Sequence, residues 1–118
     1  LKDKKVILVD DSIVRGTTSK RLISLLREAG AKEVHMCISS PPITDPCYYG
    51  IDTSIRKELI SARLSIDEIK DYIGADGLYY LSLDGLSMAV EDPNKEKMCS
   101  SCITGIYPTE VEGMEAEV

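Results

Sequence analysis

Hydrophobic residues in this chain form short continuous runs in some places and follow helical spacing in others. Residues 6–9 are uninterrupted and aliphatic, which is typical of a strand in a parallel sheet covered on both faces. Between residues 18 and 29, apolar side chains recur at the spacing of one helix face: Leu22, Leu25, Leu26 and Ala29. This spacing predicts an amphipathic helix, and Gly30 is well placed to end it in a left-handed conformation.

The pattern continues with two more strands and several short helices. Residues 34–38 and 77–81 are rich in apolar and aromatic side chains, which predicts strands, and helices are expected over 54–62 and 65–73. Ser65 and Glu68 have the spacing of a capping box, and Ser82 is expected to cap a helix that runs to Val90. Strands alternating with helices predict the α/β class, with a parallel sheet and flanking helices.

Polar residues with a distinctive chemistry follow the first strand. Asp10 and Asp11 are adjacent carboxylates that repel each other unless a cation, hydroxyls or N–H groups face them. The next residues offer hydroxyls, one glycine and backbone N–H groups at the start of a helix, where anions bind. The candidate site for a phosphorylated, metal-carrying ligand therefore comprises Asp10, Asp11, Ser12, Ile13, Val14, Arg15, Gly16, Thr17, Thr18 and Ser19.

Two common phosphate-binding motifs do not fit this segment. No Gly-Lys-Ser/Thr follows, which excludes the P-loop, and the three spaced glycines of the dinucleotide fingerprint are missing. The alternative without a ligand is an ordinary strand-loop-helix turn in which Asp11 or Ser12 caps the helix. Paired acids together with three hydroxyls favour the ligand site.

Composition limits the remaining classes of function. The chain has 118 residues, a net charge of −6 and 43% hydrophobic residues, which fits one acidic domain and argues against nonspecific nucleic-acid binding. No apolar run is long enough for a membrane span and no secretory signal is present, so a cytoplasmic location is expected. Leu1 is not an initiator methionine, which indicates a piece of a longer protein. Residues 108–118 are acidic and are expected to form a frayed tail.

The four cysteines are not expected to form disulfides, because thiols stay reduced in the cytoplasm, where this chain is expected to act. Cys99 and Cys102 form a Cys-x-x-Cys pair, a spacing that fits zinc, an iron–sulfur cluster, redox chemistry or chance. One further reading is a zinc-stabilised assembly element, which requires Cys37 and Cys47 to share one ion with that pair. Cys37, in an apolar strand, is otherwise expected to be a small buried hydrophobe.

The segment from Val6 to Ser19, with its twin aspartates and Gly-Thr-Thr turn, resembles the phosphoribosyl pyrophosphate (PRPP) motif of type I phosphoribosyltransferases. The resemblance implies that Asp10 and Asp11 hold the ribose 2- and 3-hydroxyls and the associated magnesium. It also implies that residues 12–19 cradle the 5-phosphate. In that family, earlier strands, a pyrophosphate-binding loop and a mobile catalytic loop lie upstream, and none is found in this sequence.

Further motifs are similar to those of the glutamine phosphoribosylpyrophosphate amidotransferases. They are the loop from Pro41 through Cys47 to Asp52, the runs 54–59 and 80–86, and the Cys-x-x-Cys pair, so the likeness covers residues 6–107. It implies that residues 1–107 are the carboxyl-terminal part of the phosphoribosyltransferase domain. In the iron–sulfur branch, residues matching Cys47, Cys99 and Cys102 bind a [4Fe–4S] cluster, with a fourth ligand outside this chain.

The resemblance also implies a reaction and partners. PRPP, glutamine and water would give 5-phosphoribosylamine, pyrophosphate and glutamate, a step of purine synthesis. Magnesium would be the cofactor. An upstream glutaminase domain would supply the ammonia, and the full-length protein would form a homo-oligomer. The segment alone is expected to be inactive. The alternative is a PRPP- or nucleotide-binding regulatory module without catalysis.

Several polar residues receive no catalytic role from the sequence. No general acid or base is identified, and the single histidine, His35, is expected to be structural. Arg56 and Lys57 are expected on a solvated helix face rather than at a phosphate. Asp45 and Asp52 are unassigned, although the loop that carries them, residues 39–52, is expected to border the site because it follows a strand.

Overall fold

The computed structural model describes residues 1–51, 55–92, 94 and 98–110. Three parallel strands form a sheet in chain order, β1 (Lys5–Asp10), β2 (Glu33–Ile38) and β3 (Gly77–Tyr80). The helices are α1 (Thr17–Glu28), η1 (Arg56–Glu58), α2 (Ile60–Arg63), α3 (Ile66–Ile73), α4 (Leu83–Ala89) and α5 (Ser101–Thr104). The predicted α/β class with a parallel sheet and flanking helices is therefore confirmed.

The ends of the helices follow the chemistry of their cap residues. The Ser65 hydroxyl accepts a hydrogen bond from the N–H of Glu68 at 3.2 Å, and the Glu68 carboxylate accepts one from the N–H of Ser65 at 3.0 Å. The predicted capping box is thus present, and Gly74 ends α3 at φ 81°. Ser82 caps α4 as predicted, because its hydroxyl accepts a hydrogen bond from the N–H of Gly85 at 2.9 Å.

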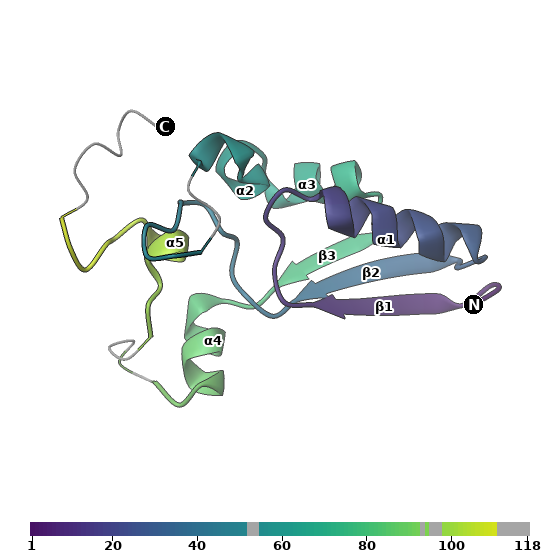
Figure 1. Ribbon diagram of the computed structural model, residues 1–118. Helices are drawn as coiled ribbons and strands as arrows, with labels where there is room; N and C mark the ends of the chain where they lie inside the picture. Colours follow the sequence, from purple (N-terminus) through teal and green to yellow (C-terminus); the bar gives the residue numbers. More distant parts are fainter. Residues whose placement is uncertain (52–54, 93, 95–97, 111–118) are drawn as a thin grey trace.

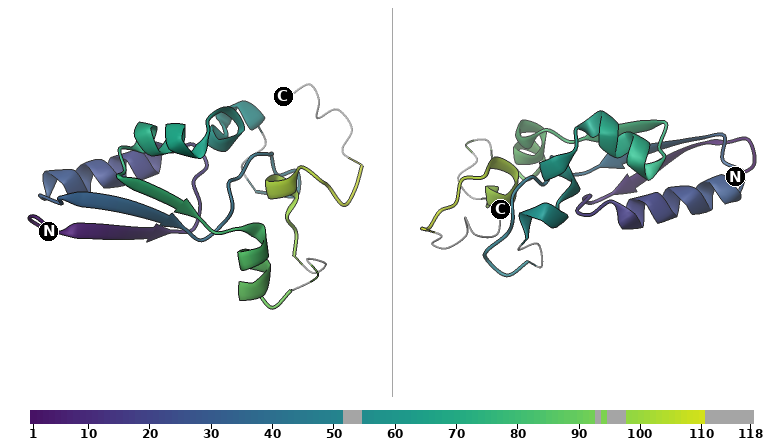
Figure 2. Two further views of the ribbon diagram at one scale, coloured as in Figure 1. Left: turned by 180° about the vertical axis from the view of Figure 1, so that it is seen from behind. Right: turned by 90° about the horizontal axis from the view of Figure 1, so that it is seen from above.

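The helices α1, α2 and α3 all lie on one face of the sheet (Figures 1 and 2). The core forms between that face and the helices, and it contains Ile13, Ile23, Val34, Met36, Ile38, Ile60, Ile69, Ile73 and Leu78. In β2, alternate residues point into this core, which is why Val34, Met36 and Ile38 are buried while the residues between them are only half-buried.

The opposite face of the sheet is open within this chain. Ile7 is 69% exposed and Val9 is 67% exposed, and Tyr79 of β3 also lies exposed on that side. The prediction that β1 is covered on both faces is therefore wrong for the described part of this chain, because its helices pack against only one face. Cys37, predicted to be buried, points to the same open face and is half-buried.

Helix α1 turns a different face to the sheet from the one predicted. Ile23 is 1% exposed and Ser19 is also buried, whereas Leu25 is 53% exposed and Leu22 lies at the surface. The helix has two apolar sides, and the short connection from β1 brings the side of Ile23 and Leu26 onto the core. Of the four predicted apolar positions only Leu26 packs against the core, so the spacing identified the helix correctly but not most of the side chains that it buries.

A separate group of contacts holds α5 against the loop that follows β2. The N–H groups of Thr44 and Asp45 both donate to the Cys102 carbonyl at 3.0 Å. The Tyr107 hydroxyl donates to the Pro46 carbonyl at 2.7 Å. This part of the chain extends beyond the end of the sheet (Figure 1). Of the predicted acidic tail, residues 111–118 lie outside the described residues.

Candidate phosphate-binding site

The segment between β1 and α1 encloses a cavity of about 310 Å³. Its lining consists of ten consecutive residues: Asp10, Asp11, Ser12, Ile13, Val14, Arg15, Gly16, Thr17, Thr18 and Ser19. These are the residues that the sequence predicted, and the structure brings all of them to one place. The cavity lies at the carboxyl end of β1, where parallel α/β sheets bind their ligands.

The two carboxylates that line this cavity are oriented by local hydrogen bonds. The Asp10 carboxylate accepts a hydrogen bond from the N–H of Asp11 at 2.8 Å, and the Asp11 carboxylate accepts one from the Ser12 hydroxyl at 3.2 Å. Two adjacent carboxylates suit Mg²⁺, which usually keeps several waters and binds one or two carboxylates together with ligand oxygens. The pair also supplies acceptors for the hydroxyls of a sugar.

The start of α1 supplies donors for an anion. Gly16 is the N-cap residue at φ 82°, and no side chain caps the helix. The first helical hydrogen bond runs from the N–H of Lys20 to the Gly16 carbonyl at 3.0 Å. The N–H groups of Thr17, Thr18 and Ser19 precede that bond, so they and the helix dipole favour an anion in the cavity.

Two residues that are distant in the sequence, Ile60 and Tyr72, lie against the loop between β1 and α1. The N–H of Ile60 donates to the Val14 carbonyl at 2.9 Å. A Cβ built on Gly16 would lie 2.9 Å from Cδ1 of Ile60 and 3.2 Å from the ring of Tyr72. Only glycine fits there, both for its space and for its positive φ. Nothing in the local sequence pattern links Ile60 or Tyr72 to this loop, so these contacts could not be predicted from the sequence.

An ion pair joins the same two segments. The Arg15 guanidinium donates to the Glu58 carboxylate at 2.8 Å, and both side chains are partly exposed. Arg15 therefore extends toward η1, while the loop that carries it lines the cavity. No local motif in the sequence points to a role for Glu58.

The loop after β2 touches the site at a single described position. The N–H of Ser39 donates to the Asp10 carbonyl at 3.0 Å, and no other described residue of 39–52 lines or bonds to the residues of the cavity. From Ser40 the loop leads to α5 instead, where Asp45 accepts a hydrogen bond from Thr44 at 2.8 Å. The prediction that this loop borders the site therefore holds for its first residue, and Asp52 lies outside the described residues.

The cysteines near α5 are neighbours. Burial, followed by the nearby Cys47 thiol and then by Cys99 and Asp45, raises the pKa of the Cys102 thiol. A hydrogen bond with Ser101 lowers the pKa of Cys99, which is exposed. Within the described part of the chain, no three His, Cys, Asp or Glu side chains are arranged to hold a metal ion. The thiols of Cys47, Cys99 and Cys102 thus lie near one another, but among the described residues they do not form a complete metal site.

The other residues considered from the sequence lie away from the cavity. His35 is 3.3 Å from the Glu33 carboxylate and stacks with Tyr79, which fits its expected structural role. Arg56 and Lys57 belong to η1 and do not line the cavity. Among the described residues, no helix has the length and hydrophobicity needed to cross a bilayer.

A parallel α/β sheet with helices on one face, with paired acids and a cavity of about 310 Å³ after its first strand, defines this chain as an α/β domain with a candidate ligand site. The family model of the phosphoribosyl transferase domain matches residues 1–68, and the chain belongs to this family. Among curated proteins, it is similar to the amidophosphoribosyltransferase of Bacillus subtilis, with 55% identity over 111 residues, which are 92% of this chain and 23% of that protein. The amidophosphoribosyltransferase of Methanocaldococcus jannaschii is 53% identical, over 94% of this chain and 23% of its own.

Solved structures have the same fold. The glutamine PRPP amidotransferase of B. subtilis complexed with ADP and GMP has a TM-score of 0.78 and 52% identity, covering 92% of this chain and 25% of its own. The structure of the allosteric regulatory enzyme of purine biosynthesis has a TM-score of 0.84 and 51% identity, covering 96% of this chain and 25% of its own. The chain spans about a quarter of the length of these relatives.

Proposed function

We propose that this chain is the PRPP-binding part of an amidophosphoribosyltransferase, which transfers ammonia derived from glutamine to PRPP. The observation that carries the proposal is the cavity between Asp10 and Ser19, which joins two carboxylates to the amino end of α1. The similarity to amidophosphoribosyltransferases over nine-tenths of the chain supports the choice of reaction. Because the chain covers about a quarter of those proteins, the complete activity is assigned to the longer protein.

The two ends of the cavity suit the two ends of the ligand. Asp10 and Asp11 would accept hydrogen bonds from the ribose 2- and 3-hydroxyls and would hold Mg²⁺, which offsets the negative charge of the pyrophosphate group. The N–H groups at the start of α1, with the hydroxyls of Thr17 and Thr18, would bind the 5-phosphate. Holding the ribose at both ends fixes C1 for attack by ammonia, so this segment contributes positioning and charge stabilisation.

Substitution of the twin aspartates tests this assignment in the full-length protein. Asp10→Asn and Asp11→Asn are expected to lower kcat/KM for PRPP by at least about 100-fold, because each removes a charged acceptor that positions the ribose and the metal. Asp84→Asn, in α4 and outside the cavity, is the matched control. Turnover near the wild-type level in both aspartate variants would contradict the proposed site.

We also propose that Cys47, Cys99 and Cys102 bind a [4Fe–4S] cluster together with a fourth ligand outside this chain. The proximity of these thiols supports the proposal. Analysis of the full-length protein purified without oxygen should find iron and acid-labile sulfide, which Cys102→Ser removes and Cys37→Ser retains. Stoichiometric zinc lost on either substitution would favour the assembly element in which all four cysteines share one ion.

A regulatory role is the second candidate function. The structural neighbour from B. subtilis is described as complexed with ADP and GMP, and a cavity that accepts a ribose 5-phosphate also fits a nucleoside monophosphate. A full-length protein that binds GMP competitively with PRPP yet forms no 5-phosphoribosylamine from PRPP and ammonia would favour a regulatory module. Formation of that product favours the enzyme.

The proposal extends to the surroundings of this segment. A glutaminase domain in the same polypeptide would supply ammonia, the full-length protein would form a homo-oligomer, and it would act in the cytoplasm. The length of the relatives leaves room for such a domain. Glutamine hydrolysis by the full-length protein and its mass in solution test the first two statements.

A further inference from the structure

The ion pair between Arg15 and Glu58 lies beside the phosphate cavity but joins two different segments. Arg15 is part of the loop that lines the cavity, and Glu58 is the last residue of η1, 43 positions later in the sequence. A guanidinium in a phosphate-binding loop is expected to contact the anion. Here its Nη2 instead lies 2.8 Å from the Glu58 carboxylate, so that its charge is already matched.

The same two segments are connected by a second and a third contact. The backbone hydrogen bond from Ile60 to Val14 measures 2.9 Å, and Cδ1 of Ile60 packs against Gly16. The residues on both sides of Arg15 are therefore fixed by Ile60, which is itself 1% exposed. Contacts at three consecutive loop residues hold one short stretch of backbone in one shape.

We infer that Arg15 and Glu58 are positioning residues for the phosphate cavity, and that the Arg15 side chain acts through Glu58 rather than as a ligand of the phosphate. The ion pair holds the loop against η1 and α2, which keeps the N–H groups at the start of α1 directed at the anion. This inference rests on the proposed binding of PRPP. In this arrangement the phosphate is bound by backbone N–H groups and hydroxyls, and the Arg15 side chain supports the loop without contacting the phosphate.

Two modes of action give opposite patterns in a mutant cycle. If Arg15 acts through Glu58, then Arg15→Gln and Glu58→Gln each weaken PRPP binding about two- to fivefold, the range of a partly exposed ion pair. The double variant is then no weaker than either single variant. If Arg15 binds the phosphate directly, Arg15→Gln costs about 10-fold or more, and Glu58→Gln costs nothing or strengthens binding.

The decisive experiment is calorimetric titration of the full-length protein with PRPP and Mg²⁺, accompanied by KM and kcat. We expect the single variants to raise Kd and KM with kcat little changed, and the exchanged pair Arg15→Glu with Glu58→Arg to regain most of the loss. Arg21→Glu makes the same change of charge on the outer surface of α1 and is expected to leave Kd within about twofold of wild type.

The outcomes separate this inference from the proposed function. A wild-type protein that binds no PRPP overturns the proposed function. Wild-type binding together with additive losses, or with no recovery in the exchanged pair, overturns the positioning role alone. If the exchanged pair melts at a lower temperature than wild type, PRPP binding by the two Gln variants and their double variant decides whether Arg15 and Glu58 are positioning residues. Gln preserves the length of the Glu58 side chain and removes only its charge.

Discussion

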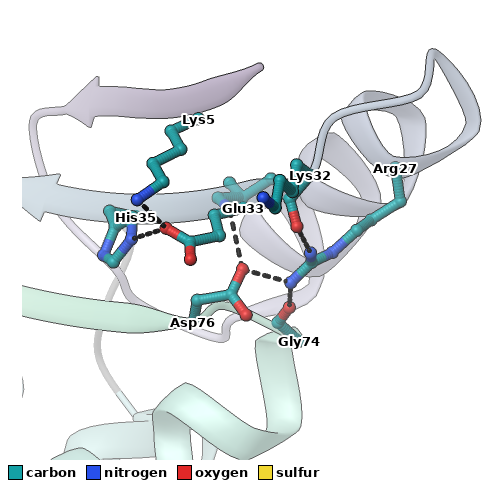
Figure 3. A network of polar contacts seen from close by, with 8 residues as sticks. Lys5, Arg27, Lys32, Glu33, His35, Gly74 and Asp76 are labelled. Carbon is teal, nitrogen blue, oxygen red and sulfur yellow. Dashed lines mark hydrogen bonds and ion pairs between the residues drawn. The ribbon is translucent and has the colours of Figure 1, made fainter. Parts of the chain in front are cut away.

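The carboxylate of Asp76 accepts a hydrogen bond from the N–H of Val34 at 2.7 Å. Arg27 also donates to this carboxylate at 2.8 Å and to the Gly74 carbonyl at 2.8 Å, so that the end of α1 is joined to the starts of β2 and β3 (Figure 3). The hydrogen bond from Val34, and then the Arg27 guanidinium, hold the pKa of Asp76 below its usual value against the opposing effect of desolvation. The network lies at the end of the sheet opposite the phosphate cavity.

The lowered pKa gives a direction for stability in acid. Because Asp76 binds a proton less readily when folded, its contribution is complete above its unfolded pKa, near 3.8, and is lost as pH falls through the lower folded value. Asp76→Ala should cost about 1–3 kcal/mol at neutral pH, since the buried N–H of Val34 loses its partner. Chemical denaturation at pH 7 and at pH 3 measures this.

The control for this prediction is Arg27→Gln, which removes the charge and retains the hydrogen bond from Val34. It should cost less, about 0.2–1 kcal/mol, as expected for an exposed ion pair. Equal losses in the two variants, or a loss from Asp76→Ala that is larger at pH 3 than at pH 7, would contradict this account.

Gly16 and Gly74 offer a matched test of the loop support. Both have positive φ, 82° and 81°, but a Cβ on Gly16 would meet Ile60 at 2.9 Å while a Cβ on Gly74 would meet nothing closer than 4.0 Å. Gly74→Ala should cost about 1–2 kcal/mol for its backbone conformation. Gly16→Ala should cost about 1–3 kcal/mol more, because Ile60 is fully buried and has little room to move.

Thermal unfolding of the two glycine variants compares these costs, and PRPP titration shows their effect on the cavity. Only Gly16→Ala is expected to weaken binding. Equal destabilisation by both substitutions would mean that the contact with Ile60 and Tyr72 relaxes without cost.

Tyr107 provides a prediction at high pH. Desolvation and then the nearby Asp45 raise the pKa of its phenol to about 12. A raised folded pKa means that its stabilising effect is complete below the unfolded value of 10.0 and is lost as pH rises toward 12. The hydrogen bond to Pro46, and with it the contact of the chain after α5, should therefore fail in that range.

Ultraviolet titration of the tyrosines measures this change. Burial also raises the pKa of Tyr80, so Tyr107→Phe should remove the late ionisation of Tyr107 and leave that of Tyr80 in place. Tyr79→Phe, a substitution on the open face of the sheet, should leave both late steps in place. An unchanged late fraction in Tyr107→Phe would disprove the assignment.

The open face of the sheet predicts self-association of this chain when it is expressed alone. Ile7 and Val9 are 69% and 67% exposed on an edge strand, and such surfaces pair with other chains. Ile7→Lys should raise the fraction of monomer in sedimentation experiments. Ile106→Lys is the control, because Ile106 is 76% exposed but lies away from the sheet. An equal effect of both substitutions would point to charge rather than to this face.

Local chemistry made part of this structure predictable from the sequence. The capping box of Ser65 and the helix end at Gly74 depend on neighbouring residues, so short motifs were sufficient. The cavity is likewise lined by one continuous segment, residues 10–19, which is the segment proposed from the sequence as a ligand site. Motifs identify such features because their geometry depends on few positions.

Features that depend on distant contacts were missed or misjudged. The inner side of α1 is determined by the sheet beneath it, and the spacing of the leucines could not distinguish Leu25 from Ile23 as the buried residue. The roles of Glu58 and Ile60 depend on contacts with residues 14–16 across more than forty positions. The hydrophobic run of β1 indicated two covered faces, whereas the described residues of this chain cover only one.

The brace from Ile60 to Val14 has a consequence for how the protein is made. The ribosome releases residues 10–19 more than forty residues before Ile60, so this loop gains its contacts with η1 and α2 only after both have emerged. A chain interrupted between the two segments would therefore contain every residue that lines the cavity and lack the hydrogen bond and the Ile60 side chain that support it.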